Sequence, residues 1–149
     1  MRIEEAIHVD KFPSVYQKVS INLIYTMTWA DVRLQEFFGE FDLTSSQYNV
    51  LRILRGQHPK PVSTALIRDR MIHRNAGASR LVDRLAAKGL LTKSTCETDR
   101  RLVDVVITEA GLGVLKQMDD RRARIDEIYA NLSAEEAEEL SRLLDKIRE

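Results

Sequence analysis

The apolar residues of the chain recur mainly at the three-to-four-residue spacing of amphipathic helices. Over residues 13–39 this spacing predicts a long helix with one buried face, which we expect to end at Gly39. Thr44, followed three residues later by Gln47, has the pattern of a capping box and predicts a second helix that reaches Gly56. The hydrophobic pattern of this first part of the chain therefore indicates a mainly α-helical protein.

The middle of the chain has the pattern of two short helices followed by a β-hairpin. Ser63 is a good cap for the first helix, and Gly89 easily adopts the left-handed conformation that ends the second. A polar turn separates the two β-compatible stretches that follow. We expect the two helices and the two strands at residues 63–71, 76–88, 90–95 and 103–107. This order is that of a winged helix-turn-helix, in which the hairpin is the wing.

Two further helices are expected after the hairpin. Thr108 is placed to cap a long helix whose apolar residues continue to Tyr129. Ser133 and Glu136 form a second capping box, which opens a last helix with its own apolar stripe. The expected fold class is therefore mainly α with a small β-hairpin wing, in which helices from both termini flank a winged helix-turn-helix lobe.

Positive charge is concentrated in one part of the chain, although the whole chain has 23 Lys and Arg against 23 Asp and Glu. Residues 68–101 contain nine basic and four acidic residues, whereas residues 109–149 contain seven basic and eleven acidic residues. A local basic patch is what binding to nucleic-acid phosphates requires, whatever the total charge. We expect residues 68–101 to face DNA and the acidic C-terminal segment to face away from it.

The second short helix and the hairpin turn carry the candidate DNA contacts. The helix begins with small residues, which let its backbone approach the floor of the major groove, and Arg80 and Arg84 lie one turn apart on it. In the turn, Asp99 is placed to orient an arginine that enters a narrow minor groove. The predicted DNA-binding residues are Ser63, Asn75, Ala76, Gly77, Ser79, Arg80, Arg84, Lys88, Asp99, Arg100 and Arg101.

These segments resemble the MarR family of winged helix-turn-helix transcriptional regulators. Residues 80–85 (Arg-Leu-Val-Asp-Arg-Leu) and 88–91 (Lys-Gly-Leu-Leu) resemble the family's recognition helix and its exit. Residues 99–101 (Asp-Arg-Arg) resemble its wing motif, and residues 105–111 resemble the strand that leads into its next helix. The resemblance implies a single domain over residues 1–149, with dimerisation helices at about 13–39 and 109–149 and a winged helix-turn-helix lobe at about 43–108.

The resemblance also implies partners and a mode of action. It implies a homodimer that binds a pseudo-palindromic operator in double-stranded DNA, most simply as a repressor. It further implies release of the DNA by a small effector, often a phenolic or other aromatic acid. The candidate effector contacts are Tyr25, Trp29 and Arg33 on the first long helix, although Trp29 is also a natural packing residue.

One departure from the family and one alternative function stay open. Residues 75–78 (Asn-Ala-Gly-Ala) lack the hydroxyl-rich start of the family's recognition helix, so either the helix begins later or this stretch packs closely on DNA. The alternative function is a protein-interaction scaffold without sequence-specific DNA binding, which would need an exposed apolar patch on the recognition helix.

The sequence offers no pattern that indicates an enzyme, a metal site or a cofactor. His8, His58 and His73 are scattered, and no catalytic set or glycine-rich phosphate loop is evident. Cys96 is the single cysteine, so an internal disulfide is excluded, and we interpret it as a passive residue. With no expected signal peptide or membrane-spanning segment, we expect a cytoplasmic protein with no membrane partner.

Overall fold

The computed structural model describes residues 1–74 and 76–149, and in these ranges it is mostly helical with a small antiparallel sheet. The elements in chain order are α1 (Ile3–Ala6), α2 (Val15–Gly39), α3 (Ser45–Gln57), β1 (Val62–Ser63), α4 (Thr64–Arg70), α5 (Ala78–Ala87), β2 (Leu91–Thr95), β3 (Val103–Ile107), α6 (Glu109–Asp120), α7 (Ala123–Asp126), the 3₁₀ turn η1 (Glu127–Tyr129) and α8 (Ala134–Ile147). This architecture confirms the predicted fold class.

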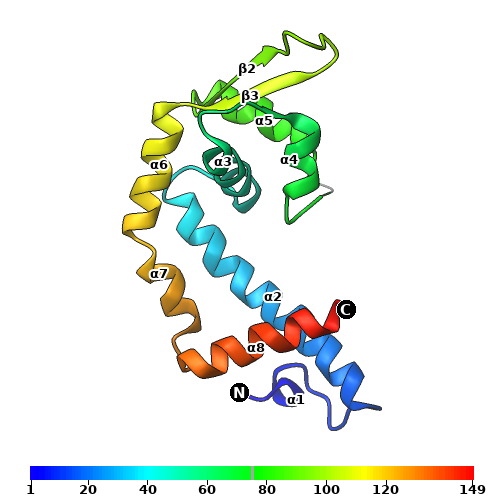
Figure 1. Cartoon of the computed structure of the whole chain (residues 1–149). Helices are drawn as coiled ribbons and strands as arrows, with labels where there is room; N and C mark the ends of the chain where they lie inside the picture. The colour runs from blue at the N-terminus through cyan, green and yellow to red at the C-terminus, as the bar shows by residue number, and fades with distance from the viewer. Residues whose placement is uncertain (75) are drawn as a thin grey trace.

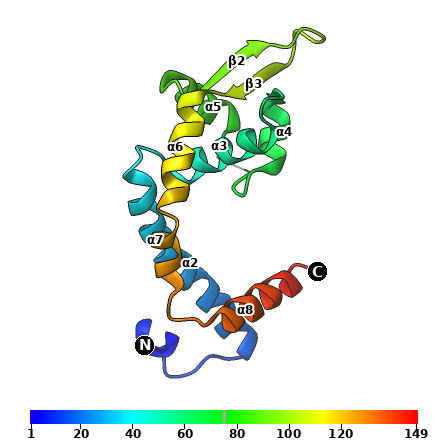
Figure 2. The ribbon, with the colours of Figure 1, turned by 60° about the vertical axis from the view of Figure 1, so that its left-hand side comes forward.

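The molecule has a winged lobe at one end and both chain termini near the other end (Figures 1 and 2). The winged lobe comprises α3, α4, α5 and the three strands, and the β2–β3 hairpin projects from it (Figure 1). Helix α2 and the α6–α7 segment connect the lobe to the far end, where α8 lies (Figures 1 and 2). The winged lobe is therefore separated from the helices at the far end of the molecule.

Helices α2, α3 and α8 each begin at a residue whose side chain caps the helix. Ser14 accepts a hydrogen bond from the backbone N–H of Gln17 at the start of α2. At the start of α3, the Gln47 N–H donates to Thr44 Oγ1 over 3.2 Å, and the Thr44 N–H donates to Gln47 Oε1 over 3.0 Å. Ser133 and Glu136 make the same reciprocal pair at the start of α8, so both predicted capping boxes are confirmed.

Helix α5 begins two residues later than predicted. Gly77 is its N-cap residue and has a φ of +69°, so the chain is left-handed immediately before Ala78. A residue with this backbone conformation cannot belong to a right-handed helix. The recognition helix therefore begins after Gly77, later than residue 76. At the other end, Gly89 has a φ of +72° and ends the helix as predicted.

The sheet has three strands, one more than predicted, in the order β1-β3-β2. In the predicted hairpin, Leu91 pairs with Ile107 and Thr95 with Val103. The additional strand, β1, pairs Val62 with Val105. A strand of two residues has no alternation pattern to find, so only its distant partner defines it.

The helix predicted from Thr108 to Tyr129 is interrupted, and this prediction was wrong in its second half. Helix α6 ends at Asp120, and the chain then bends into α7 and η1. At the bend, Arg121 Nη1 donates to Glu40 Oε2 over 3.3 Å, and Arg124 forms an ion pair with the same carboxylate. The bend brings α7 against α2 and lets Ile125 pack on the core.

The short helix α1 was not predicted and packs close to the start of α2. Lys18 Nζ donates to Glu4 Oε1 over 2.6 Å, and this hydrogen bond holds the pKa of the Glu4 carboxyl below its usual value. The contact joins residues 14 positions apart, which local periodicity cannot reveal.

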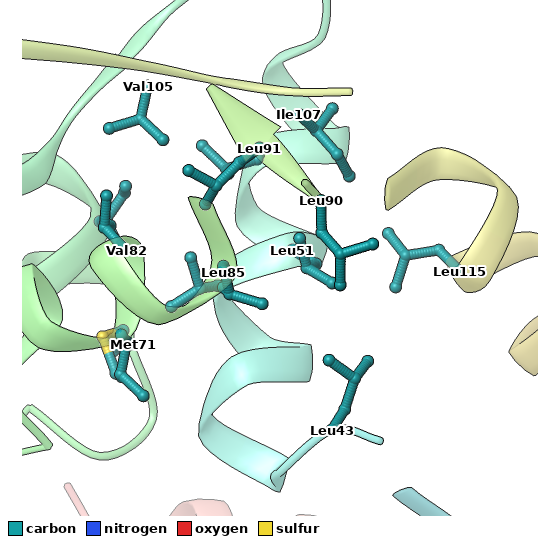
Figure 3. Close-up of a cluster of buried hydrophobic side chains, with 14 of the residues drawn as sticks. Leu43, Leu51, Met71, Val82, Leu85, Leu90, Leu91, Val105, Ile107 and Leu115 are labelled. Carbon is teal, nitrogen blue, oxygen red and sulfur yellow. The ribbon is translucent and has the colours of Figure 1, made fainter. Parts of the chain in front are cut away.

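The hydrophobic core lies in the winged lobe and extends to the end of α2 and to α6 (Figure 3). Leu51 of α3, Leu85 of α5, Leu91 of β2, Val105 of β3 and Leu115 of α6 are each at most 2% exposed. Each buried leucine of this kind contributes about 1.5–3 kcal/mol to stability. The core therefore fixes the recognition helix and the wing relative to each other.

Candidate nucleic-acid interface

Helix α5 presents its polar face outward. Its apolar residues Leu81, Val82 and Leu85 are buried, whereas Arg80 and Arg84 are exposed. The exposed positions among the ten residues of α5 carry no large apolar side chain. The apolar patch that a protein-interaction scaffold would need on this helix is therefore not found there.

The turn of the wing is shaped by Asp99. Asp99 Oδ1 accepts a hydrogen bond of 3.0 Å from the backbone N–H of Arg101, and its carbonyl oxygen accepts from the N–H of Leu102 over 2.9 Å. The carboxylate thus orients the backbone of Arg101 rather than its guanidinium group. Arg100 and Arg101 are exposed, and neither has a carboxylate partner within 4 Å among the described residues.

A concave surface between α4, the start of α5 and the base of the wing collects six of the predicted residues. We call it the wing hollow. The predicted residues that line it are Ser63, Ala76, Gly77, Ser79, Arg80 and Arg101, and the others are Thr64, Ala65, Arg68, Ala78, Leu102 and Val103. No Asp or Glu is among these lining residues. Asn75, also predicted, lies outside the described residues.

Arg84 and Lys88 lie apart from the wing hollow. They line a second concave surface, together with Asp42 of the α2–α3 connection and Gln47 of α3. Lys88 Nζ lies 3.1 Å from Asp42 Oδ2 and also donates to the Asp42 carbonyl oxygen. The ammonium group that was predicted to meet DNA is therefore paired with Asp42 of the α2–α3 connection.

The basic residues of the 68–101 segment differ in whether a carboxylate lies beside them. Lys88 and Lys93 are paired with Asp42 and Asp83, respectively. Arg68 lies 3.7 Å from Asp69, whereas Arg80, Arg84 and Arg101 have no carboxylate partner in the part of the chain that the structure describes. Their guanidinium groups keep their donors for an external acceptor.

Arg68 lines the wing hollow but was not among the predicted residues. It lies one helical turn after Thr64, which lines the same surface. The spacing of four residues from the start of α4 is the one sequence signal that could have placed it on this face.

The candidate effector residues share one face of α2, at intervals of four residues. The Arg33 guanidinium carbon lies 4.0 Å from the Trp29 ring centroid, and Arg33 Nη1 donates to the Trp29 carbonyl oxygen over 3.0 Å. Trp29 is half-buried and Tyr25 is exposed. Neither concave surface described above includes these three residues.

The part of the chain that the structure describes contains neither a metal-binding cluster nor a membrane-spanning helix. Within residues 1–74 and 76–149 no group of three or more His, Cys, Asp or Glu side chains is placed to hold a metal ion. In the same ranges, no helix combines the length and the apolar character needed to cross a bilayer.

Comparisons with known proteins agree with this arrangement. The sequence profile of the MarR family matches residues 41–102, which span most of the winged lobe. The chain is 32% identical over 106 residues to the HTH-type transcriptional regulator MhqR of Bacillus subtilis, an alignment that covers 70% of this chain and 72% of MhqR.

Solved structures of relatives cover nearly the whole chain. A MarR transcription factor from Planctomyces limnophilus is 34% identical, with a TM-score of 0.71 over 91% of this chain and 98% of that one. BpsR of Bordetella bronchiseptica, whose DNA binding is regulated by 6-hydroxynicotinic acid, is 25% identical, with a TM-score of 0.77 over 89% and 99%. The chain therefore belongs to the MarR family of DNA-binding transcription regulators.

Proposed function

We propose that the chain is a homodimeric repressor that binds a pseudo-palindromic operator, with α5 in the major groove and the wing in the adjacent minor groove. The observation that carries this proposal is the set of exposed arginines on α5 and the wing, which lack carboxylate partners among the described residues. Guanidinium groups held out in this way suit base edges and phosphates. A dimer places two such surfaces about one helical turn of DNA apart.

The predicted residues take different parts in this complex. Arg80 lies in the first turn of α5, from which side chains of a recognition helix reach base edges. Arg100 and Arg101 meet the minor groove or the backbone. Lys88 supports the end of α5 through Asp42.

The proposal is tested by titrating the protein into fluorescently labelled duplexes at several salt concentrations. One duplex carries the region upstream of the protein's own gene, and the other is a scrambled sequence of the same composition. We expect tighter binding to the first duplex and an affinity that falls steeply with salt for both. Equal, salt-insensitive binding to the two duplexes would contradict sequence-specific regulation.

The dimer is supported by apolar surface that a single chain leaves exposed at the end far from the wing. The exposed residues are Val15, Val19, Leu23, Ile24 and Met27 on α2 and Leu140, Leu143 and Ile147 on α8. No residue of α8 is buried within the chain. Because exposed apolar residues on two helices at the same end of the molecule are typical of a subunit interface, we assign α2 and residues 109–149 to the dimer interface and residues 43–108 to DNA binding.

Replacing Leu143 by glutamate is expected to dissociate the dimer, because the interface would then bury an unpaired charge. We expect the dimer dissociation constant to rise by at least about a hundredfold, as measured by sedimentation. Ser141→Glu is the matched control, because it adds the same charge to α8 outside the apolar stripe. A Leu143→Glu protein that sediments like the wild type would remove α8 from the interface.

The effector is proposed to be an aromatic carboxylic acid that binds beside Trp29. Arg33, stacked on the indole ring, offers a cation to the carboxylate, and the relative BpsR responds to 6-hydroxynicotinic acid. Trp29 is the only tryptophan, so its fluorescence reports binding directly. We expect 6-hydroxynicotinic or benzoic acid to change this fluorescence saturably and to weaken DNA binding, and Arg33→Gln to abolish both effects. Unchanged DNA affinity at saturating acid would contradict the proposed release mechanism.

A further inference from the structure

Arg68 lies in the wing hollow beside Arg80 and Arg101, the residues proposed above to contact DNA. Arg68 belongs to α4, Arg80 to the first turn of α5, and Arg101 to the turn of the wing. Three elements thus contribute one cation each to the same concave surface, and α4 has no other charged residue there.

The Arg68 side chain remains available to an external anion. Its carboxylate neighbour is Asp69, whose Oδ1 lies 3.7 Å from Arg68 Nε, and the two side chains are 60% and 68% exposed. Exposed ion pairs of this kind contribute little, because water screens them. A phosphate that accepts two hydrogen bonds from the guanidinium group would compete successfully with Asp69.

The remainder of the wing hollow also suits an anion. Its lining residues include no carboxylate, so nothing within it repels a negative charge. Ala65 and Gly77 have no bulky side chain, so they leave room for an anion at this surface. The hydroxyl groups of Thr64 and Ser79 add hydrogen-bond donors.

We propose that Arg68 binds a backbone phosphate of the DNA in the wing hollow, together with Arg101. This inference rests on the proposed function, because it assigns a partner to a surface already placed against DNA. A phosphodiester oxygen pair fits the planar guanidinium fork, and such a contact fixes the position of the strand without reading its sequence. Arg68 thereby holds the strand that runs between the recognition helix and the wing.

The test compares Arg68→Gln with Arg70→Gln in the salt titrations described above. Both arginines are exposed on α4, but Arg70 does not line the hollow. We expect Arg68→Gln to weaken binding to both duplexes by roughly tenfold per subunit, in line with the loss of a charge-assisted hydrogen bond. The plot of log affinity against log salt, whose slope is negative, should become shallower by about 0.9 for each subunit. Arg70→Gln should leave the slope at its wild-type value.

Two further measurements test whether the partner of Arg68 is a phosphate of the DNA. Arg68→Lys retains the charge, so its slope should stay at the wild-type value while the affinity falls less than in Arg68→Gln. Thermal unfolding with inorganic phosphate at constant ionic strength tests for a site that binds free phosphate instead. Stabilisation of the wild type but not of Arg68→Gln, combined with equal DNA slopes, would overturn the DNA assignment.

The failure of this inference is distinguishable from the failure of the proposed function. If the wild type binds DNA with a steep salt dependence and Arg68→Gln keeps the same slope, only the role of Arg68 is overturned. If the wild type itself shows no salt-dependent binding, the proposed function fails.

Discussion

Replacing Gly111 by alanine is expected to lower the free energy of unfolding by about 3 kcal/mol, at the upper end of what overpacking usually costs. A Cβ atom at this position would overlap the Leu90 carbonyl oxygen and would lie 2.7 Å from Ile107 Cγ1. The Leu90 carbonyl cannot move away cheaply, because the N–H of Thr108 donates to it over 3.1 Å. The start of α6 is thus packed against the α5–β2 connection with no room for a methyl group.

Gly113→Ala is the matched control for this prediction. Gly113 lies in the same helix, and nothing lies within 4 Å of an added Cβ there. Alanine is favoured over glycine in a helix by about 0.5–1 kcal/mol, so this variant should be slightly more stable than the wild type. Urea unfolding followed by circular dichroism compares the proteins at one fixed concentration, since dimerisation also affects stability. A Gly111→Ala protein as stable as the wild type would show that α6 is free to shift.

The parts of the fold that could be predicted from sequence are those whose hydrogen bonds are local. Thr44 and Gln47 exchange their capping bonds three residues apart, and the positive φ of Gly89 ends α5 as its identity suggests. The break after α6 could not be predicted, because the carboxylate that holds Arg121 and Arg124 is that of Glu40, more than 80 residues earlier. Periodicity alone favoured a continuous helix there.

The residues of the candidate site, too, could be predicted only where the sequence signal is local. Arg80 and Arg101 could be found because each lies in a recognisable local motif. Arg68 could not be grouped with them, because the wing hollow forms only when α4, α5 and the wing pack together. The pairing of Lys88 with Asp42 was equally hidden, since the two residues are 46 positions apart.

Replacing Arg101 by alanine is expected to weaken binding to every duplex about equally, by roughly tenfold or more per subunit. A cation inserted by the wing responds to the negative potential of a narrow groove and of the backbone, which most sequences share. The salt slope should fall together with the affinity. The measurement is the set of salt titrations on the upstream and scrambled duplexes, extended to duplexes with single base-pair changes.

Replacing Arg80 by alanine is expected to act differently, because its position in the first turn of α5 suits a base edge. A bidentate contact to guanine discriminates against a wrong base by about 1–3 kcal/mol. Binding to the upstream duplex should therefore fall far more than binding to the scrambled one, and the ratio of the two affinities should collapse. Lys11→Ala removes an exposed cation between α1 and α2, at the end of the molecule far from the wing, and should change neither quantity. Equal losses on all duplexes for both Arg80→Ala and Arg101→Ala would contradict this division between reading the sequence and holding the backbone.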